Sequence, residues 1–334
     1  MKTTKTSLLL LSTLFAAALS AAASDERINR DVAAHPGGKL VLDVDFGNVD
    51  VSPGADDKVA VEAFRSIDFG NEAKEKEYLA AAAITITADA NTVIVRTHAP
   101  AEARRTLPNH TRMDARYTVR VPKNFSADLS TGGGAIAASQ LSGDLRANSG
   151  GGDLHCSHVR GTVSAQSGGG SVNLNECSGT VEITTGGGDI VCTAGNGSLH
   201  ACTGGGTIEV RDFRGDTKAS SGGGQLTLER IDGAISGETA GGSIAASFAG
   251  SALKKITLVS SGGDIYLVLS KAAAADISAE TGAGRITTDL PLEITSTGDE
   301  HLRGKLNGGG AAIRLRTNGG SIRINSSGGA TVSR

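Results

Sequence analysis

The chain has 334 residues, with 47 glycines, 6 prolines, no tryptophan, 3% aromatic residues and a formal net charge of −3. This near-neutral charge argues against a nucleic-acid partner, since such proteins carry a strong basic excess. A high glycine content can accompany disorder, but disordered chains lack the aliphatic and β-branched residues that recur here at regular intervals.

Residues 1–23 have the pattern of a signal peptide. Lys2 and Lys5 are followed by an apolar stretch at residues 8–19 and by three alanines at 21–23. The apolar stretch is too short to span a membrane. We expect cleavage near Ser24, which changes the formal charge from −3 to −5, and an exported chain without an integral membrane segment. The expected location is the periplasm, the cell surface or the extracellular space.

Residues 24–131 are predicted to form a strand-rich capping portion. Apolar and polar residues alternate at 40–44, 59–61, 84–86, 93–95 and 117–121, which is typical of strands with one buried face. Only residues 72–83 have a helical pattern. Because the open end of a stack of strands must be covered, a less regular first portion suits a cap.

Residues 132–334 are predicted to form a regular β-solenoid with its C-terminal rungs. Triple glycines recur every 18 residues, beginning at Gly132, Gly150, Gly168, Gly186, Gly204 and Gly222. Four residues after each first glycine stands an aliphatic residue, namely Ile136, Leu154, Val172, Ile190, Ile208 and Leu226. With the first glycine as position one, apolar residues alternate at positions five and seven and again, after a turn, at positions fourteen and sixteen. Each repeat therefore holds two short strands.

Matched residues at a fixed interval require stacking in register, which predicts an all-β, parallel β-helix of about nine to eleven rungs. At about 4.8 Å per rung its axis measures roughly 50 Å. Beyond Ala240 the spacing lengthens, with glycine pairs near 261–263 and 282–284 that we interpret as rungs with longer turns. Residues 308–324 repeat the pattern again.

The arrangement resembles the bacterial putative-adhesin domain family of secreted β-solenoids, whose function is largely unknown. The resemblance rests on F-G-N-V-D-V at residues 46–51, V-R-V-P at 119–122, the T-x-G-G-x-I rhythm of the repeats and the glycine-rich segment at 303–324. It covers nearly the whole mature chain. The family suggests adhesion at a surface and supplies no catalytic or binding residues.

Neither a calcium site nor a zinc site is expected. Calcium-binding nonapeptide repeats need G-G-x-G-x-D, whereas Asp153, Asp189 and Asp264 follow glycine directly. His155, Cys156 and His158 include zinc-ligand types, but strand alternation turns Cys156 inward and His155 outward. His200 falls in an outward column of charged residues and is interpreted as part of a solvated ladder.

Most of the four cysteines are expected to be unpaired. Cys156 and Cys192 share a core column but lie two rungs apart, about 9.6 Å, which exceeds the span of a disulfide. Cys177 lies on the intervening rung, so one diagonal bridge stays open as an alternative. Cys202 should face away from this column.

No nucleophile motif, zinc-protease motif or phosphate loop is present, and no cofactor is indicated. We therefore predict a protein that is not an enzyme. The remaining feature is a basic cluster, which could hold an anionic partner or be a solvated loop. It comprises Arg104, Arg105, Arg112, Arg116, Arg120 and Lys123.

The leading hypothesis is an adhesin-like binding or structural module of the cell envelope or surface. Its partner would be an envelope or extracellular protein or a glycan that the sequence does not identify. The alternatives are a periplasmic accessory to envelope signalling and, less favoured, a polysaccharide-active enzyme.

Overall fold

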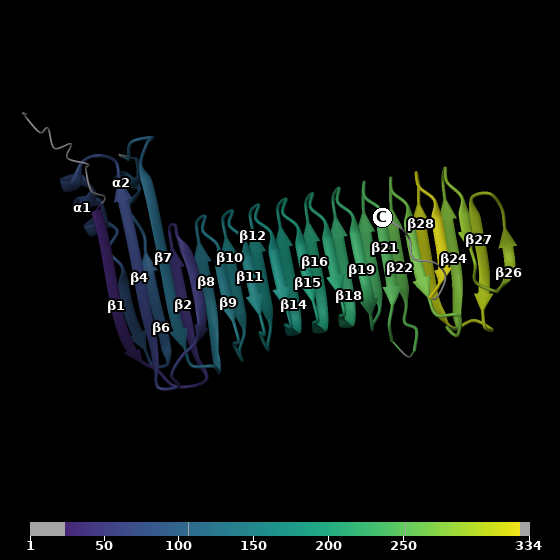
Figure 1. The fold of residues 1–334 in the computed structure, drawn as a ribbon, viewed down its shortest axis with the longest axis horizontal. Coiled ribbons are helices and arrows are strands. Elements are labelled where there is room, and N and C mark those ends of the chain that lie inside the picture. The colour runs from purple at the N-terminus through teal and green to yellow at the C-terminus, as the bar shows by residue number, and fades with distance from the viewer. Residues whose placement is uncertain (1–23, 106, 251, 328–334) are drawn as a thin grey trace, which may run out of the picture.

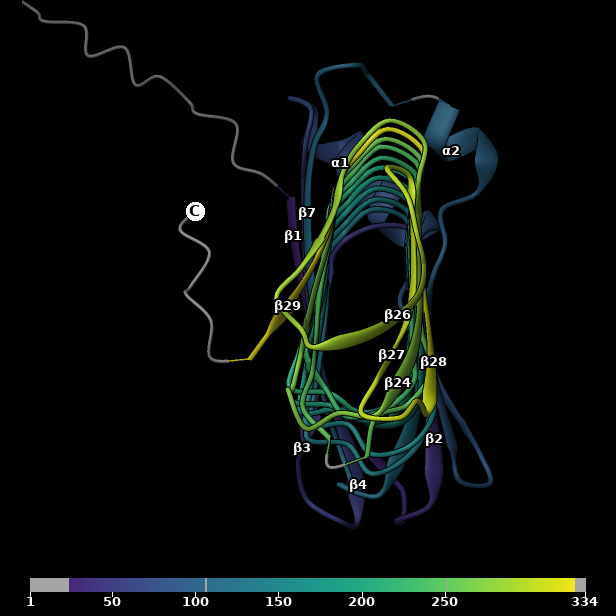
Figure 2. The ribbon, with the colours of Figure 1, turned by 90° about the vertical axis from the view of Figure 1, so that its right-hand side faces the viewer.

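A computed structural model describes residues 24–105, 107–250 and 252–327. The predicted signal peptide, residues 1–23, lies outside these described residues. The chain forms an elongated body (Figure 1) in which two sheets face each other across a narrow core (Figure 2). Most neighbouring strands within each sheet are parallel, and the antiparallel pairs lie at the two ends of the stack, which confirms the predicted all-β solenoid.

Sheet A is the wall that contains the strand directly after each triple glycine. In stacking order its strands are β1 (Ser24–Ala33), β4 (Lys58–Asp68), β7 (Arg112–Val121), β3 (Asn48–Pro53), β9 (Ile136–Ser139), β11 (Leu154–Ser157), β13 (Val172–Asn175), β15 (Ile190–Thr193), β17 (Ile208–Arg211), β19 (Leu226–Ile231), β21 (Ile244–Phe248), β23 (Ile265–Leu269), β29 (Ile322–Ser326) and β25 (Ile286–Thr288).

Sheet B is the opposite wall. From the same end its strands are β5 (Thr85–Asp89), β6 (Thr92–Thr97), β2 (Gly38–Val44), β8 (Phe125–Thr131), β10 (Leu145–Ser149), β12 (Val163–Ser167), β14 (Ser178–Thr185), β16 (Asn196–Thr203), β18 (Arg214–Ser221), β20 (Ile235–Thr239), β22 (Ile256–Ser260), β28 (Ala311–Thr317), β24 (Ala275–Thr281), β27 (His301–Leu306) and β26 (Leu292–Thr297).

Equivalent residues of successive repeats lie directly opposite one another in the sheets. Leu154 pairs with Val172, and Val172 pairs with Ile190, all three with no exposed surface. Burial of such a side chain contributes about 1.5–3 kcal/mol. The predicted 18-residue register is therefore confirmed, and repetition of the same apolar residue type builds a continuous core.

A column of buried hydroxyls ties each rung to its neighbour. Ser167 donates from Oγ to the carbonyl of Gly152 at 2.8 Å and accepts the amide of Gly170 at 2.9 Å. We call this column the hydroxyl ladder; its members are Thr131, Ser149, Ser167, Thr185, Thr203, Ser221, Thr239, Ser260, Thr281 and Thr317. It satisfies backbone groups at the bend, where strand pairing leaves them without partners.

The stacking order differs from the chain order at both ends. Near the C-terminus, β28 and β29 lie between the β22/β23 rung and the β24/β25 rung (Figure 1), so the last rung in sequence is not the last in space. Near the N-terminus, β2 and β3 lie between β6/β7 and β8/β9. At both ends, therefore, the order of the rungs in space does not follow their order in the sequence.

The rung count also exceeds the prediction of nine to eleven. Counting each pair that contributes one strand to each wall, the described residues form twelve rungs: β6/β7, β2/β3, β8/β9, β10/β11, β12/β13, β14/β15, β16/β17, β18/β19, β20/β21, β22/β23, β28/β29 and β24/β25. At about 4.8 Å per strand, the fourteen strands of sheet A extend about 60 Å rather than 50 Å.

The first portion of the chain, residues 24–131, supplies both rungs and end strands. Strands β1 and β4 extend sheet A by antiparallel pairing beyond β7, and β5 does the same for sheet B beyond β6. Helix α1 (Glu72–Ala81) begins at Asn71, whose side chain accepts the amide of Lys74 at 3.1 Å, and it packs over a small separate core. Neither α1 nor the short α2 (Ala101–Arg105), the helices of the described part of the chain, has the length and apolarity needed to cross a membrane.

Candidate functional site

The structure divides the predicted basic cluster between two sides of the molecule. Arg112, Arg116 and Arg120 project from one face of β7, because alternate residues of a strand point the same way and their neighbours Ala115, Tyr117 and Val119 are buried. Helix α2, which carries the remaining two arginines of the cluster, lies on the opposite side of the stack (Figure 2).

Lys123 is exposed in the turn between β7 and β8, where its carbonyl accepts the amide of Ser142. Arg105 is exposed on α2. The predicted residues therefore include one group of three that share a face, together with three others that do not join it.

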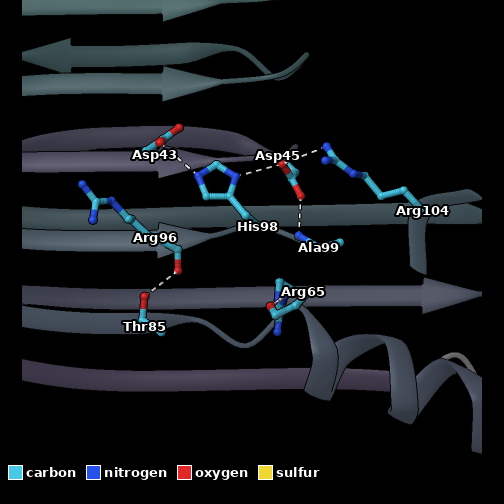
Figure 3. A network of polar contacts seen from close by, with 9 residues as sticks. Asp43, Asp45, Arg65, Thr85, Arg96, His98, Ala99 and Arg104 are labelled. Atoms are coloured by element: carbon cyan, nitrogen blue, oxygen red, sulfur yellow. Dashed lines mark hydrogen bonds and ion pairs between the residues drawn. The ribbon is translucent and has the colours of Figure 1, made fainter. Parts of the chain in front are cut away.

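Arg104 belongs to a different arrangement, a polar network at the end of β2 and β6 (Figure 3). The ring of His98 lies between two carboxylates, with Nδ1 2.9 Å from Asp45 and Nε2 3.0 Å from Asp43. Asp45 also accepts the amide of Ala99 at 2.6 Å and lies 3.4 Å from Arg104. The hydrogen bond to Asp45, followed by that to Asp43, raises the pKa of His98. Together these hydrogen bonds hold the segment that leads to α2 against sheet B.

The face that carries the three β7 arginines continues onto β4 and β1. Phe64 of β4 lies opposite Arg116 on one side and opposite Arg27 of β1 on the other. The guanidinium carbon of Arg27 lies 5.2 Å from the centroid of the half-buried Phe64 ring, within range of a cation–π contact. Within the described part of the chain, neither Arg27 nor Arg116 forms an ion pair.

Beside this row lies a shallow hollow of about 630 Å³. Two ion pairs line it, Lys58 with Asp31 and Arg120 with Glu62, each at 2.7 Å, and Asn29 adds an amide. The hydrogen bond from Lys58 to Asp31 raises the pKa of this lysine, which therefore stays charged. The hollow thus offers closely spaced hydrogen-bond donors and acceptors to a polar ligand.

We call this surface the cap face. It consists of the outward residues of β1, β4 and β7 around the ring and the hollow: Arg27, Asn29, Asp31, Lys58, Glu62, Phe64, Arg116 and Arg120.

The side chains considered for metal binding have structural roles. Cys156 is buried and His155 is exposed, as alternation predicted. Asp153 accepts the amide of Ser171 in the next rung at 2.8 Å, and Asp189 and Asp264 make equivalent bonds. Within the described ranges, no group of three or more potential ligand side chains is placed to hold a metal ion.

All four cysteines, which lie within the described residues, have free thiols, so the diagonal bridge that the sequence left open is not formed in this structure. Cys156 and Cys192 occupy one column with Leu174 between them, and Cys177 is buried beside them. Cys202 lies on the outward side of sheet B, where its Sγ is 3.3 Å from His200 Nε2. His200 itself stands between Glu182 and Lys218 in register, as expected of the charged ladder.

Among curated proteins, the comparison found no match. Similar solved structures include a putative cell adhesion protein from Clostridium sporogenes (11% identity, 90% of this chain and 100% of that chain, TM-score 0.21). Others are a putative adhesin from Bacteroides fragilis (14%, 90% and 97%, TM-score 0.36) and a putative lipid binding protein from Parabacteroides distasonis (9%, 90% and 96%, TM-score 0.31). Residues 38–325 match the family model described as Toastrack DUF4097, which confirms the resemblance drawn from the sequence: the chain belongs to this family.

Proposed function

We propose that this protein is an exported, non-enzymatic module of the cell envelope or surface that binds a partner in the manner of an adhesin through its cap face. Export is supported by the signal-peptide pattern of residues 1–23. A narrow, filled core supports the binding role, because it makes a stiff frame whose outward positions are free to vary without loss of packing.

The observation that carries the proposal is the composition of the cap face. It combines a half-buried aromatic ring, a hollow lined by paired charges and two arginines, Arg27 and Arg116, that form no ion pair with any described residue. The carboxylates that line this hollow, Asp31 and Glu62, each bind a cation of the protein, an arrangement that suits recognition more than acid–base catalysis.

The test compares two pairs of arginines that the sequence had placed in one cluster. The purified mature chain is measured for binding to envelope fractions of the producing cell and to a panel of immobilised extracellular proteins and glycans. We expect Arg116→Ser/Arg120→Ser to weaken binding, while Arg104→Ser/Arg105→Ser, which removes the same charge from the opposite side, leaves it unchanged.

Equal losses in the two variants would contradict the assignment of the cap face. Absence of binding by the unaltered chain would contradict the function itself. Specific capture of a sensor or anti-sigma protein from the envelope fraction would favour the alternative role in envelope signalling.

A further inference from the structure

The row of Arg27, Phe64 and Arg116 on the cap face has the geometry of a subsite for a sugar that carries a carboxylate. We propose that the partner of this face is an acidic polysaccharide, whose carboxylates bind the two arginines and whose ring packs on Phe64. The inference rests on the proposed binding function and specifies its ligand.

The first step concerns charge. The guanidinium groups of Arg27 and Arg116 have no ion pair among the described residues. Arg120, on the same strand as Arg116, differs because it binds Glu62. A guanidinium presents paired donors that match the two oxygens of a carboxylate, and such bidentate bonds are stronger than those between neutral groups. Two cations without an anionic partner among the described residues therefore leave two positions for anionic groups.

The second step concerns spacing. Arg27, Phe64 and Arg116 stand side by side on three neighbouring strands, in direct register. The backbones of the two arginines are thus about 9.6 Å apart, with the aromatic ring midway between them. A linear polymer with charged groups along its length can contact both arginines while one of its rings covers Phe64, displacing the guanidinium of Arg27 from that ring toward the ligand.

The third step concerns the class of ligand. The adjoining hollow is lined by carboxylates, an amide and ammonium and guanidinium groups, among them Asn29, Asp31 and Lys58. Sugar hydroxyls both donate and accept hydrogen bonds, so they match a mixed set of this kind. An acidic peptide such as polyglutamate would supply carboxylates but no hydroxyl groups for these donors and acceptors. A polysaccharide accounts for both parts of the cap face.

The experiment measures binding of the mature chain to immobilised polygalacturonate, to the same polymer after reduction of its carboxyl groups, and to polyglutamate. We expect polygalacturonate to bind at least about tenfold more tightly than the reduced polymer, since hydrogen bonds to charged groups are stronger than those between neutral groups. It should also bind more tightly than polyglutamate, which carries carboxylates but has no sugar ring to pack on Phe64. Binding should weaken as salt is added, because the cap face is exposed.

Two variants locate the contact. Arg27→Ser/Arg116→Ser should weaken binding to polygalacturonate by about tenfold or more, and Phe64→Leu, which retains apolar volume without the ring, should also weaken it. The matched control is Arg146→Ser/Arg160→Ser, which removes two exposed arginines outside the cap face. Circular dichroism and thermal unfolding establish that each variant is folded.

Equal affinities of the cap-face and control variants would overturn the proposal, as would full affinity in Phe64→Leu. Equal binding of polyglutamate would show that charge alone, or a peptide, is recognised. If the chain binds envelope fractions but not polygalacturonate, the choice of ligand is wrong while the proposed binding function stands.

Discussion

The triple glycine of each repeat contains one position that should tolerate a side chain and another that should not. A Cβ added to Gly170 would lie 2.3 Å from the carbonyl oxygen and 2.4 Å from the carbonyl carbon of Gly152 in the preceding rung. A Cβ added to Gly169 would meet no atom within 4 Å. The variants Gly170→Ala and Gly169→Ala therefore add the same methyl group to adjacent residues with opposite consequences.

The magnitude follows from what must move. To admit the methyl group, the two rungs must separate, which strains the packing and weakens the bonds that Ser167 makes to Gly152 and Gly170. Overpacking costs about 1–3 kcal/mol and each hydrogen bond about 1 kcal/mol, so Gly170→Ala should lower the free energy of unfolding by about 2–5 kcal/mol. Gly169→Ala should change it by less than about 0.5 kcal/mol.

Urea denaturation followed by far-ultraviolet circular dichroism measures both variants. Because a solenoid can unfold in part, hydrogen exchange in β11 and β13 would locate the loss at the affected rungs. If Gly170→Ala is no less stable than Gly169→Ala, the close carbonyl contact between rungs is wrong.

Three further outcomes follow from particular residues. Ala194 has a left-handed φ of 56°, so Ala194→Gly should raise the free energy of unfolding by about 1 kcal/mol, measured by urea denaturation. Burial raises the pKa of Cys156 and of Cys192 to about 12, so a thiol reagent should modify the native chain at Cys202 at most. Denatured, unreduced protein should show four free thiols, and a smaller number would reveal a disulfide. The pKa of His98 is raised by folding, so its contribution to stability is complete below the unfolded pKa and is lost as pH rises through the folded value; His98→Gln should remove this dependence from denaturation midpoints measured between about pH 5 and 9.

The repeat itself could be predicted because its signal is strong and local. Triple glycines at fixed intervals mark the bends, and the aliphatic residue four positions later, such as Val172 or Ile190, identifies the buried face. The stacking order could not be predicted in the same way. Ile256, Ile313 and Ile277 stand in one column at the C-terminal end, so the pattern fits any order of these rungs. The connections between strands decide the order, and they carry no repeat.

Only part of the candidate site could be predicted from the sequence, for a related reason. Closeness in sequence suggested one cluster for the arginines, but the chain crosses from sheet B to sheet A between Arg104 and Arg116, which separates them in space. Phe64 was missed because it lies in the irregular first portion, where the partner strands of β4 could not be inferred. The available signal was its place in the alternating run that follows Val59 and Val61, which puts it on the outward face.

The hydroxyl ladder predicts that hydrogen bonding, rather than side-chain volume, is the reason for serine or threonine before each triple glycine. Thr185 donates to the carbonyl of Gly170 at 2.7 Å and accepts the amide of Gly188 at 3.3 Å. Thr185→Val keeps the shape but leaves both backbone groups without this partner, so it should lower the free energy of unfolding by about 1–3 kcal/mol.

Thr185→Ser is the matched control, because it keeps the hydroxyl and removes one methyl group. Serine already occupies this position at Ser167 and Ser221, with bonds of 2.8 Å to the preceding rung. Its cost should therefore stay below about 0.8 kcal/mol, the contribution of one buried carbon group. Urea denaturation measures the free energy of unfolding of both variants. If Thr185→Val is as stable as Thr185→Ser, side-chain packing alone explains why serine or threonine recurs in this column, and the hydroxyl ladder does not hold the rungs together.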